Sequence, residues 1–349
     1  MSRLDDALEL VAIDSVSRGE AAIAHHVAVV LARNPDLDVE RIGDNVVART
    51  TGHHATRLLV AGHLDTVPGD ASSATIVGDE LRGVGACDMK GSLAVMLELA
   101  SAPTPRSVVV TWVFYAREEI SRSDSGLLEI KELRPDLLDA DAAILAEPTD
   151  GRVEAGCQGS LRVSVVMKGA RAHTARPFTG RNAIHRLGDV ITKVAGYEPR
   201  ATTIDGIEFV EQLQVVDISG GVAPNVVPDR ALCTLNHRFA PDRTKDEAFA
   251  WIVEFLSDVT DTGDTVRLVD WAPPSPPSMT NERLASLVEL TGERPKGKLG
   301  WTDVATFTEL SIPATNFGAG DPLLAHRSDE FVTLAQLDQF ASVLSAWLK

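Results

Sequence analysis

Residues 107–119 read SVVVTWVFYAREE. A run of β-branched and aromatic side chains without polar alternation predicts a strand that is buried on both faces. Further short strands are predicted at 45–49, 58–62 and 142–146. Helical spacing occurs at 4–12, 20–33, 92–100 and 126–134. Buried strands separated by helices are typical of α/β proteins, so we expect a mixed, largely parallel sheet flanked by helices.

The pattern changes after residue 158. Strands and helices then follow in the order βαββαβ, at 161–167, 182–196, 209–218, 230–237, 244–258 and 265–271. This order resembles a ferredoxin-like α+β unit. The proline-rich stretch WAPPSPPS (271–278) ends it, because proline cannot continue a sheet. We therefore expect a first domain made of residues 1–158 and 273–349, with a second domain, residues 159–272, inserted into it.

The composition is that of a soluble globular chain: of 349 residues, 44% are hydrophobic and 24% are charged. A formal net charge of −17 argues against a nucleic-acid partner, which would require a basic surface. No apolar run reaches the roughly 18 residues that a membrane span needs, and the N-terminus resembles an amphipathic helix rather than an export signal. The three cysteines fit neither a disulfide framework nor a zinc knuckle. We expect a cytoplasmic protein with no membrane or nucleic-acid partner.

The predicted strands end in residues that can bind a metal. These residues are His63 and Asp65 after 58–62, Glu118 and Glu119 after 107–116, Glu147 after 142–146, and Asp88 in the turn GVGACDMKG (83–91). Ligands of open α/β sheets bind beyond the carboxyl ends of the strands, so we expect these side chains to converge. Carboxylates with histidine suit a divalent cation, most often zinc. The alternative is that each acid is a solvated loop residue, but a close set of carboxylates would repel one another without cations.

Five motifs together resemble a known superfamily. They are HLDTVP (63–68), GVGACDMKG (83–91), EE (118–119), AEPT (146–149) and AHRSDEFV (325–332). Their order and spacing are similar to those of the dizinc deacylases and peptidases, which include glutamate carboxypeptidases, aminoacylases, acetylornithine deacetylases and succinyl-diaminopimelate desuccinylases. The resemblance covers essentially the whole chain, including the inserted domain.

This resemblance implies two Zn²⁺ per chain, for which Co²⁺ could substitute. It implies that His63 and Glu147 hold one ion, that Glu119 and His326 hold the other, and that Asp88 bridges them. It further implies that Asp65 orients His63, because metal-bound imidazoles usually have such a partner. Glu118 would be the general base that takes a proton from the bridging water as hydroxide attacks the amide carbonyl.

The inserted domain would be a lid and a dimerisation domain, in a homodimer. Its His173 would reach the neighbouring subunit's site and stabilise the oxyanion; a plain surface histidine is the alternative. The resemblance also implies substrate contacts from Ser160, Asn225 and Arg238. At the start of this domain, Cys157 and Gln158 stand where several desuccinylases have arginines, which leaves the substrate's carboxylate contacts open.

The overall sequence most resembles that of compact bacterial desuccinylases. This implies hydrolysis of N-succinyl-L,L-2,6-diaminopimelate to succinate and L,L-diaminopimelate, in lysine and diaminopimelate biosynthesis. Residues 160–200 hold eight Lys and Arg against two acids, which suits a small anionic acylated amino acid. An acetylornithine deacetylase or another N-acyl amino acid deacylase of the superfamily is the alternative. A non-catalytic binding or assembly homologue is a third possibility, although no predicted site residue is lost.

Overall fold

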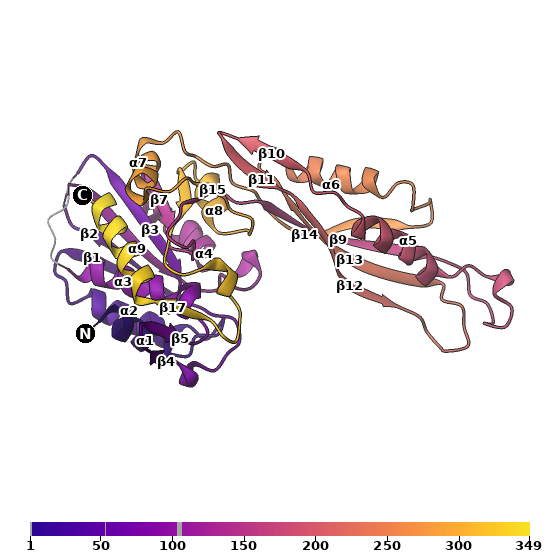
Figure 1. The fold of residues 1–349 in the computed structure, drawn as a ribbon, viewed down its shortest axis with the longest axis horizontal. Helices are drawn as coiled ribbons and strands as arrows, with labels where there is room; N and C mark the ends of the chain where they lie inside the picture. Colours follow the sequence, from indigo (N-terminus) through magenta and orange to yellow (C-terminus); the bar gives the residue numbers. More distant parts are fainter. Residues whose placement is uncertain (1, 53, 103–106) are drawn as a thin grey trace. The chain divides into compact units, whose positions relative to one another are not determined.

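The computed structural model describes residues 2–52, 54–102 and 107–349, and the chain forms two compact units (Figure 1). Unit 1 comprises Met1–Gly156, Pro277–Lys296 and Asp303–Lys349, and unit 2 comprises Cys157–Pro276 and Gly297–Thr302. The short segment Gly297–Thr302 belongs to unit 2, although in the sequence it lies between two parts of unit 1. Gly297 explains this placement, because a side chain there would meet the Glu208 carbonyl oxygen at 2.5 Å. Such a long-range contact has no sequence pattern.

Unit 1 is built on a mixed sheet with a parallel centre. Its strand order is β1 (Leu37–Ile42), β2 (Asn45–Thr50), β6 (Val109–Tyr115), β3 (Arg57–His63), β7 (Ala142–Leu145), β16 (Ala314–Asn316), β8 (Glu154–Ala155) and β15 (Lys296–Gly297). The pairs β6–β3, β3–β7 and β7–β16 are parallel. The pairs β1–β2 and β2–β6 are antiparallel. The predicted fold class is confirmed.

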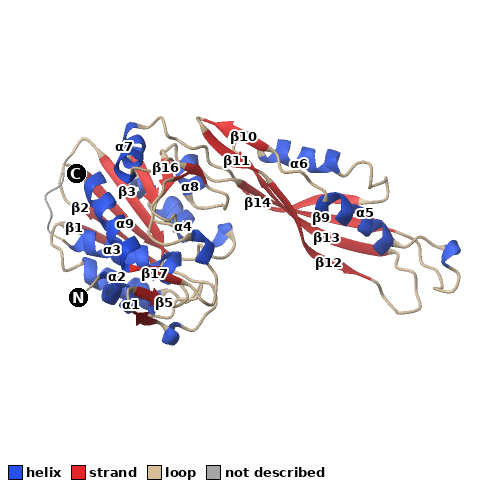
Figure 2. Ribbon diagram, viewed as in Figure 1, coloured by secondary structure: helices blue, strands red, loops and turns tan. Residues whose placement is uncertain are grey.

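Helices cover both faces of this sheet, as the blue and red elements of Figure 2 show. The helices of unit 1 are α1 (Arg3–Val11), α2 (Ala21–Leu31), α3 (Gly91–Ser101), α4 (Gly126–Leu133), α7 (Glu282–Thr291), α8 (Val304–Glu309) and α9 (Leu334–Trp347). One hydrophobic cluster joins α1, α2, α3, α7 and α9 to sheet residues that include Val60 and Trp112. The alternate sheet residues Leu59 and Val113 are also buried, and α4 and α8 contact the strands. Burial on both faces explains the continuous apolar runs of the sequence.

A small sheet, β17 (Phe331–Thr333), β5 (Glu80–Arg82) and β4 (Thr75–Val77), completes the described part of unit 1. Within the described residues, no helix is long and apolar enough to cross a membrane.

Unit 2 has the ferredoxin-like order that the sequence predicted. Its antiparallel sheet runs β12 (Gln212–Gly220), β13 (Arg230–Phe239), β9 (Gly159–Lys168) and β14 (Thr265–Ala272). The helices α5 (Ala183–Ala195) and α6 (Lys245–Phe255) share one hydrophobic cluster with β9 and β13, so both cover the same face. The other face of β9 and β13 carries polar side chains, because burial alternates along both strands.

The single strand predicted at 209–218 is wrong. Residues Ile207–Val210 form β11, which pairs with β10 (Ala201–Ile204) in a separate hairpin, and β12 begins only at Gln212. Glu211 lies between the two strands with its carboxylate buried, where it accepts a hydrogen bond from the Ala240 amide (3.1 Å) and one from Arg200 (3.0 Å). A buried acid that needs these partners interrupts an otherwise regular strand pattern.

Candidate metal centre

Three neighbouring strands of unit 1 deliver the candidate residues to one edge of the sheet. In the parallel order β6–β3–β7, His63 is the last residue of β3 and lies level with Tyr115 of β6. Glu118 and Glu119 follow β6, and Glu147 follows β7. The fourth contribution is Asp88, from the helical turn Ala86–Lys90 that leads into α3. Parallel strands end on the same side, so residues far apart in sequence meet here.

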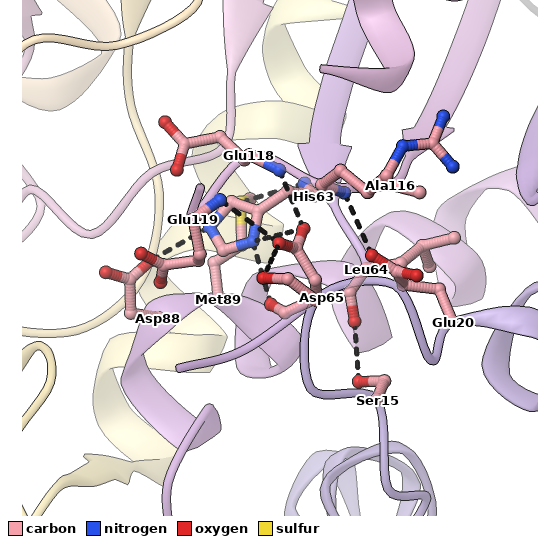
Figure 3. A network of polar contacts seen from close by, with 12 residues as sticks. Ser15, Glu20, His63, Leu64, Asp65, Asp88, Met89, Ala116, Glu118 and Glu119 are labelled. Atoms are coloured by element: carbon pink, nitrogen blue, oxygen red, sulfur yellow. Dashed lines mark hydrogen bonds and ion pairs between the residues drawn. The ribbon is translucent and has the colours of Figure 1, made fainter. Parts of the chain in front are cut away.

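His63, Asp88 and Glu119 form a compact ligand group. One ligand atom from each lies within 4.8 Å of the others. His63 Nε2 is 3.1 Å from Asp88 Oδ1, while His326 Nε2 is 3.5 Å from Asp88 Oδ2 and 3.0 Å from Glu119 Oε1. Asp88 therefore presents one oxygen to each histidine, which is the arrangement a bridging ligand requires. The stick view shows Asp88 and Glu119 side by side next to His63 (Figure 3).

Glu118 and Glu147 lie outside this compact group but close enough to act on it electrostatically. Burial opposes the charged form of His63, yet the hydrogen bond and charge of Asp88, with the charges of Glu147 and Glu118, raise the pKa of His63 well above its usual value. Desolvation, followed by the charge of Glu147, raises the pKa of Glu118 well above that of an ordinary glutamate. In Figure 3 the side chains of Glu118 and Glu119 point in different directions. The neighbouring acids can therefore serve different purposes.

His326 titrates under the same influence. Its hydrogen bond to Glu119 is the largest effect and raises the pKa of His326 to about 9. The site thus concentrates carboxylates around two histidines, and the surrounding negative charge raises the pKa of both histidines. A divalent cation would offset this mutual repulsion of the carboxylates. Oxygen and imidazole donors without thiolate are the ligands of zinc and its harder neighbours, so the residues fit such an ion.

Asp65 makes contacts that the sequence did not reveal. Its backbone carbonyl oxygen lies 2.9 Å from His63 Nδ1, whereas its carboxylate is 3.7 Å from that nitrogen. The carboxylate instead accepts hydrogen bonds from the backbone amides of Glu118 (3.0 Å) and Glu119 (3.1 Å) and from the Ser17 hydroxyl (2.7 Å). The main chain of Asp65 contacts the imidazole of His63, and its side chain holds the glutamate pair.

Glu330 is a second supporting carboxylate that sequence reasoning missed. Its Oε1 accepts hydrogen bonds from the amides of Cys87 (2.8 Å) and Asp88 (2.9 Å). Glu330 is almost fully buried, and burial is the main reason that its pKa is raised to about 7. It stands in the motif AHRSDEFV, so its position in a known motif was the available signal.

In unit 2 the predicted residues form two separate pairs. Arg238 of β13 lies opposite Ser160 of β9 in the strand register. His173 and Asn225 lie in adjacent loops, because the Thr174 amide donates to the Asn225 carbonyl oxygen (3.1 Å) and His173 forms a backbone bridge with Val226. His173 and Asn225 are both exposed.

Strand β9 separates these two pairs. Ser160 is near its beginning, while the loop that carries His173 follows its last residue, Lys168. The loop continues outward beside the segment before β13, since Gly169 donates to the Asp229 carbonyl oxygen at 2.8 Å. At about 3.3 Å per residue, Ser160 and Lys168 are about 26 Å apart. One small substrate cannot touch both pairs within a single copy of unit 2.

Comparison with known proteins agrees with this architecture. Residues 59–349 match peptidase family M20/M25/M40. A Mycobacterium tuberculosis protein provisionally described as a succinyl-diaminopimelate desuccinylase is 44% identical over 351 residues, which cover 98% of each chain. The succinyl-diaminopimelate desuccinylase of Corynebacterium glutamicum is 40% identical over 97% of this chain and 94% of its own.

Among solved structures, an M20 family metallo-carboxypeptidase from Sulfolobus solfataricus has the same fold. It superposes with a TM-score of 0.78 over 100% of this chain and 98% of its own, at 18% sequence identity. The likeness in structure extends over both units, and the family match covers every proposed metal ligand. The chain belongs to peptidase family M20/M25/M40, a family of hydrolases.

Proposed function

We propose that this chain is a zinc-dependent desuccinylase that hydrolyses N-succinyl-L,L-2,6-diaminopimelate to succinate and L,L-diaminopimelate, a cytoplasmic step of lysine and diaminopimelate biosynthesis. The observation that carries this proposal is the carboxylate and histidine cluster around Asp88, in a chain 40–44% identical to proteins described as desuccinylases over nearly its whole length.

Two ions would share Asp88. His63 and Glu147 would hold one, and Glu119 and His326 the other, which accounts for the contact of each histidine with a different oxygen of Asp88. When bound, the zinc ions would polarise the amide carbonyl and make a water molecule acidic. Co²⁺ has similar ligand preferences and would substitute.

Glu118 is the proposed general base. Its amide is held by Asp65, its side chain points away from Glu119, and it is partly exposed, so a substrate can approach it. It would accept the proton of the attacking water and deliver it to the leaving amine nitrogen, since a raised pKa makes a carboxylate a stronger proton acceptor than an ordinary glutamate.

Arg238 is the proposed contact for a substrate carboxylate. Among the described residues its guanidinium has no hydrogen bond or ion pair, although it is partly buried. Burial, with the neighbouring charge of Arg162, lowers the pKa of Arg238. A desolvated guanidinium without an anion is costly, and a planar carboxylate would compensate it with two parallel hydrogen bonds. Ser160, directly opposite, would add a hydroxyl.

His173 is the proposed oxyanion donor. Its Nδ1 accepts a hydrogen bond from the Ala175 amide (3.0 Å), so a neutral ring carries its proton on Nε2. This nitrogen is exposed and makes no hydrogen bond within the described residues. Such a donor would stabilise the negative charge on the carbonyl oxygen, and Asn225 in the adjacent loop would assist it.

A homodimer would reconcile the two pairs. Because Arg238 and His173 lie at opposite ends of β9, a substrate that contacts both would need them from different subunits. The edge strand β12 offers a surface for this, since its Val216 and Ile218 are 57% and 56% exposed, and Val222, just after the strand, is 59% exposed. An open edge with apolar side chains is suited to a second copy of the same strand.

A substrate panel tests the proposed function. Metal-free protein would be reconstituted with zinc and assayed with succinyl-diaminopimelate, acetylornithine and simple acyl amino acids. We expect the highest kcat/KM for succinyl-diaminopimelate, because loss of the distal carboxylate leaves a cationic group unpaired. Equal or better activity on acetylornithine would reject this substrate and keep the reaction class. If no amide is hydrolysed, the proposal that this chain is an amide hydrolase is rejected.

A further inference from the structure

The loop that carries Glu118 and Glu119 is held in an unusual way. Four successive backbone amides, those of residues 116–119, each donate to a side-chain oxygen from elsewhere in unit 1. Ala116 donates to Asn45 (2.9 Å) and Arg117 donates to Glu20 (3.1 Å). The amides of residues 118 and 119 both donate to Asp65. The loop therefore depends on these side chains for its conformation, and Figure 3 shows two of them, Glu20 and Asp65.

Arg117 is the strained residue of this loop. Its φ is +63°, in the left-handed region that residues with a side chain rarely adopt, and it directly precedes the glutamate pair. Such a conformation persists only where the surroundings enforce it. Its amide is held by Oε1 of Glu20, whose side chain is fully buried.

The side chain of Glu20 does not cap its own helix. Glu20 is the N-cap residue of α2, but it makes no capping hydrogen bond. Its Oε1 accepts instead from the amides of Arg18 (3.0 Å) and Arg117. The segment before α2 and the loop after β6 are thus bound to the same carboxylate oxygen.

The segment Ser15–Glu20 also reaches Asp65, which holds the amides of Glu118 and Glu119. The Ser17 hydroxyl donates to Asp65 Oδ2 at 2.7 Å, and the Ser15 hydroxyl donates to the Leu64 carbonyl oxygen at 2.8 Å. Backbone hydrogen bonds between Ser17 and Thr66 (3.3 Å) and between Thr66 and Ser15 (3.1 Å) fix the segment beside the end of β3. One stretch of chain therefore contacts the loops after both β3 and β6.

We propose that the segment Ser15–Glu20 positions the catalytic pair, Glu20 by holding the amide of Arg117 and Ser17 by fixing the carboxylate of Asp65. Neither residue touches the substrate or the metals in this proposal. They keep Glu119 directed at Asp88 and Glu118 directed away from it. The inference rests on the proposed function for its kinetic test, but its effect on metal binding can be measured without a substrate.

Two substitutions of Glu20 distinguish the length of its side chain from its negative charge. Glu20→Gln keeps an oxygen at the same distance and loses the charge, whereas Glu20→Asp keeps the charge and is one methylene too short. We expect Glu20→Asp to lower kcat by about 10²-fold with KM little changed, the usual penalty for misplacing a catalytic group by about 1 Å. Glu20→Gln should retain most of the activity. Ser17→Ala, at a partly exposed site, should lower kcat by about tenfold.

Metal affinity provides the readout that needs no substrate. Zinc titration of the metal-free variants by calorimetry should show weaker binding of one ion, by about 10–100-fold for Glu20→Asp, as expected for lost support of a ligand. The Co²⁺ absorption spectrum should change in the same variant. A wild type that binds two ions but hydrolyses no amide would reject the proposed function, while the titration would still test the positioning segment.

Asn34→Ala is the matched control. Asn34 is a buried side chain of unit 1 that accepts a hydrogen bond from the Asp36 amide (3.0 Å) and donates to the Ala100 carbonyl oxygen (2.9 Å), away from the site. Its loss should lower the melting temperature and leave kcat and metal affinity unchanged. Normal kcat and metal affinity in both Glu20→Asp and Ser17→Ala would overturn the proposal, as would a larger loss in Glu20→Gln than in Glu20→Asp. If Glu20→Asp does not fold, Ser17→Ala decides.

Discussion

Mixing two inactive variants should restore activity if unit 2 serves the site of a second copy. His173→Ala removes the proposed oxyanion donor, which typically costs about 10²–10³ in kcat. Glu118→Gln removes the proposed base, which typically costs about 10²–10⁴. Each variant alone should therefore have at most about 1% of wild-type activity, while both should still bind two zinc ions.

The expected recovery follows from the symmetry. Random exchange of equal amounts makes about half of the dimers mixed, and each mixed dimer has one site with both groups intact. Activity should therefore rise to about a quarter of wild type. The structural reason is the separation of about 26 Å between Ser160 and Lys168 of β9, which prevents His173 and Arg238 of one chain from contacting the same small substrate. Exchange would be followed by native mass spectrometry of differently tagged chains, with succinate release as the assay.

A second pair of variants serves as a control, because mixing them should not restore activity. His173 and Asn225 lie in adjacent loops of one unit, so both would serve the same site. A mixture of His173→Ala with Asn225→Ala leaves every site of a mixed dimer with one damaged group, and its activity should stay low. The reasoning is refuted if the first mixture stays inactive despite demonstrated exchange, or if both mixtures recover equally.

Four further outcomes are expected. Glu118→Gln should retain zinc binding by calorimetry, because the Asp65 contact involves only the backbone amide, and near-normal turnover would reject it as the base. Asp88→Ala should lose the most metal by elemental analysis, since it would serve both ions; loss of a single ion would argue against a bridge. Arg238→Met should lower kcat/KM for the succinylated substrate about 30- to 150-fold, since an unpaired carboxylate in a partly buried site costs about 2–3 kcal/mol. Burial of Asp264 opposes its charged form, but hydrogen bonds from Arg186 and two backbone amides outweigh burial and lower the pKa of Asp264 to about 2. The Arg186–Asp264 pair should therefore contribute about 1–2 kcal/mol to the free energy of unfolding. This contribution is present above the ordinary aspartate pKa and is lost as the pH falls towards about 2. The melting temperatures of wild type and Arg186→Met should therefore differ at pH 5 and converge near pH 2.

The strand ends show what could be predicted well. The runs before His63, Glu118 and Glu147 are apolar without alternation, a pattern typical of strands buried on both faces. Since parallel strands place their carboxyl ends together, convergence at one edge followed from the pattern alone. The compact group of His63, Asp88 and Glu119 is consistent with that expectation.

Other features had no local signal. Glu211 separates β11 from β12 because of its buried contacts with Arg200 and the Ala240 amide, and an apolar pattern on both sides conceals such a break. Glu20 and Ser17 resemble ordinary helix-capping residues in the sequence, yet their side chains bond to the amide of Arg117 and the carboxylate of Asp65.

The two architectures, the insertion of one into the other, and the types of residue at the sheet edge could be predicted from the sequence. These follow from periodicity and chain order, which are repeated local signals. The tertiary structure alone decided which atoms meet: that the carbonyl rather than the carboxylate of Asp65 is the nearer to His63, and that Arg238 and His173 lie at opposite ends of β9. A hydrogen bond forms only within about 3 Å and along a narrow range of angles. Its partners are therefore chosen by the packing of distant segments, which no local pattern contains.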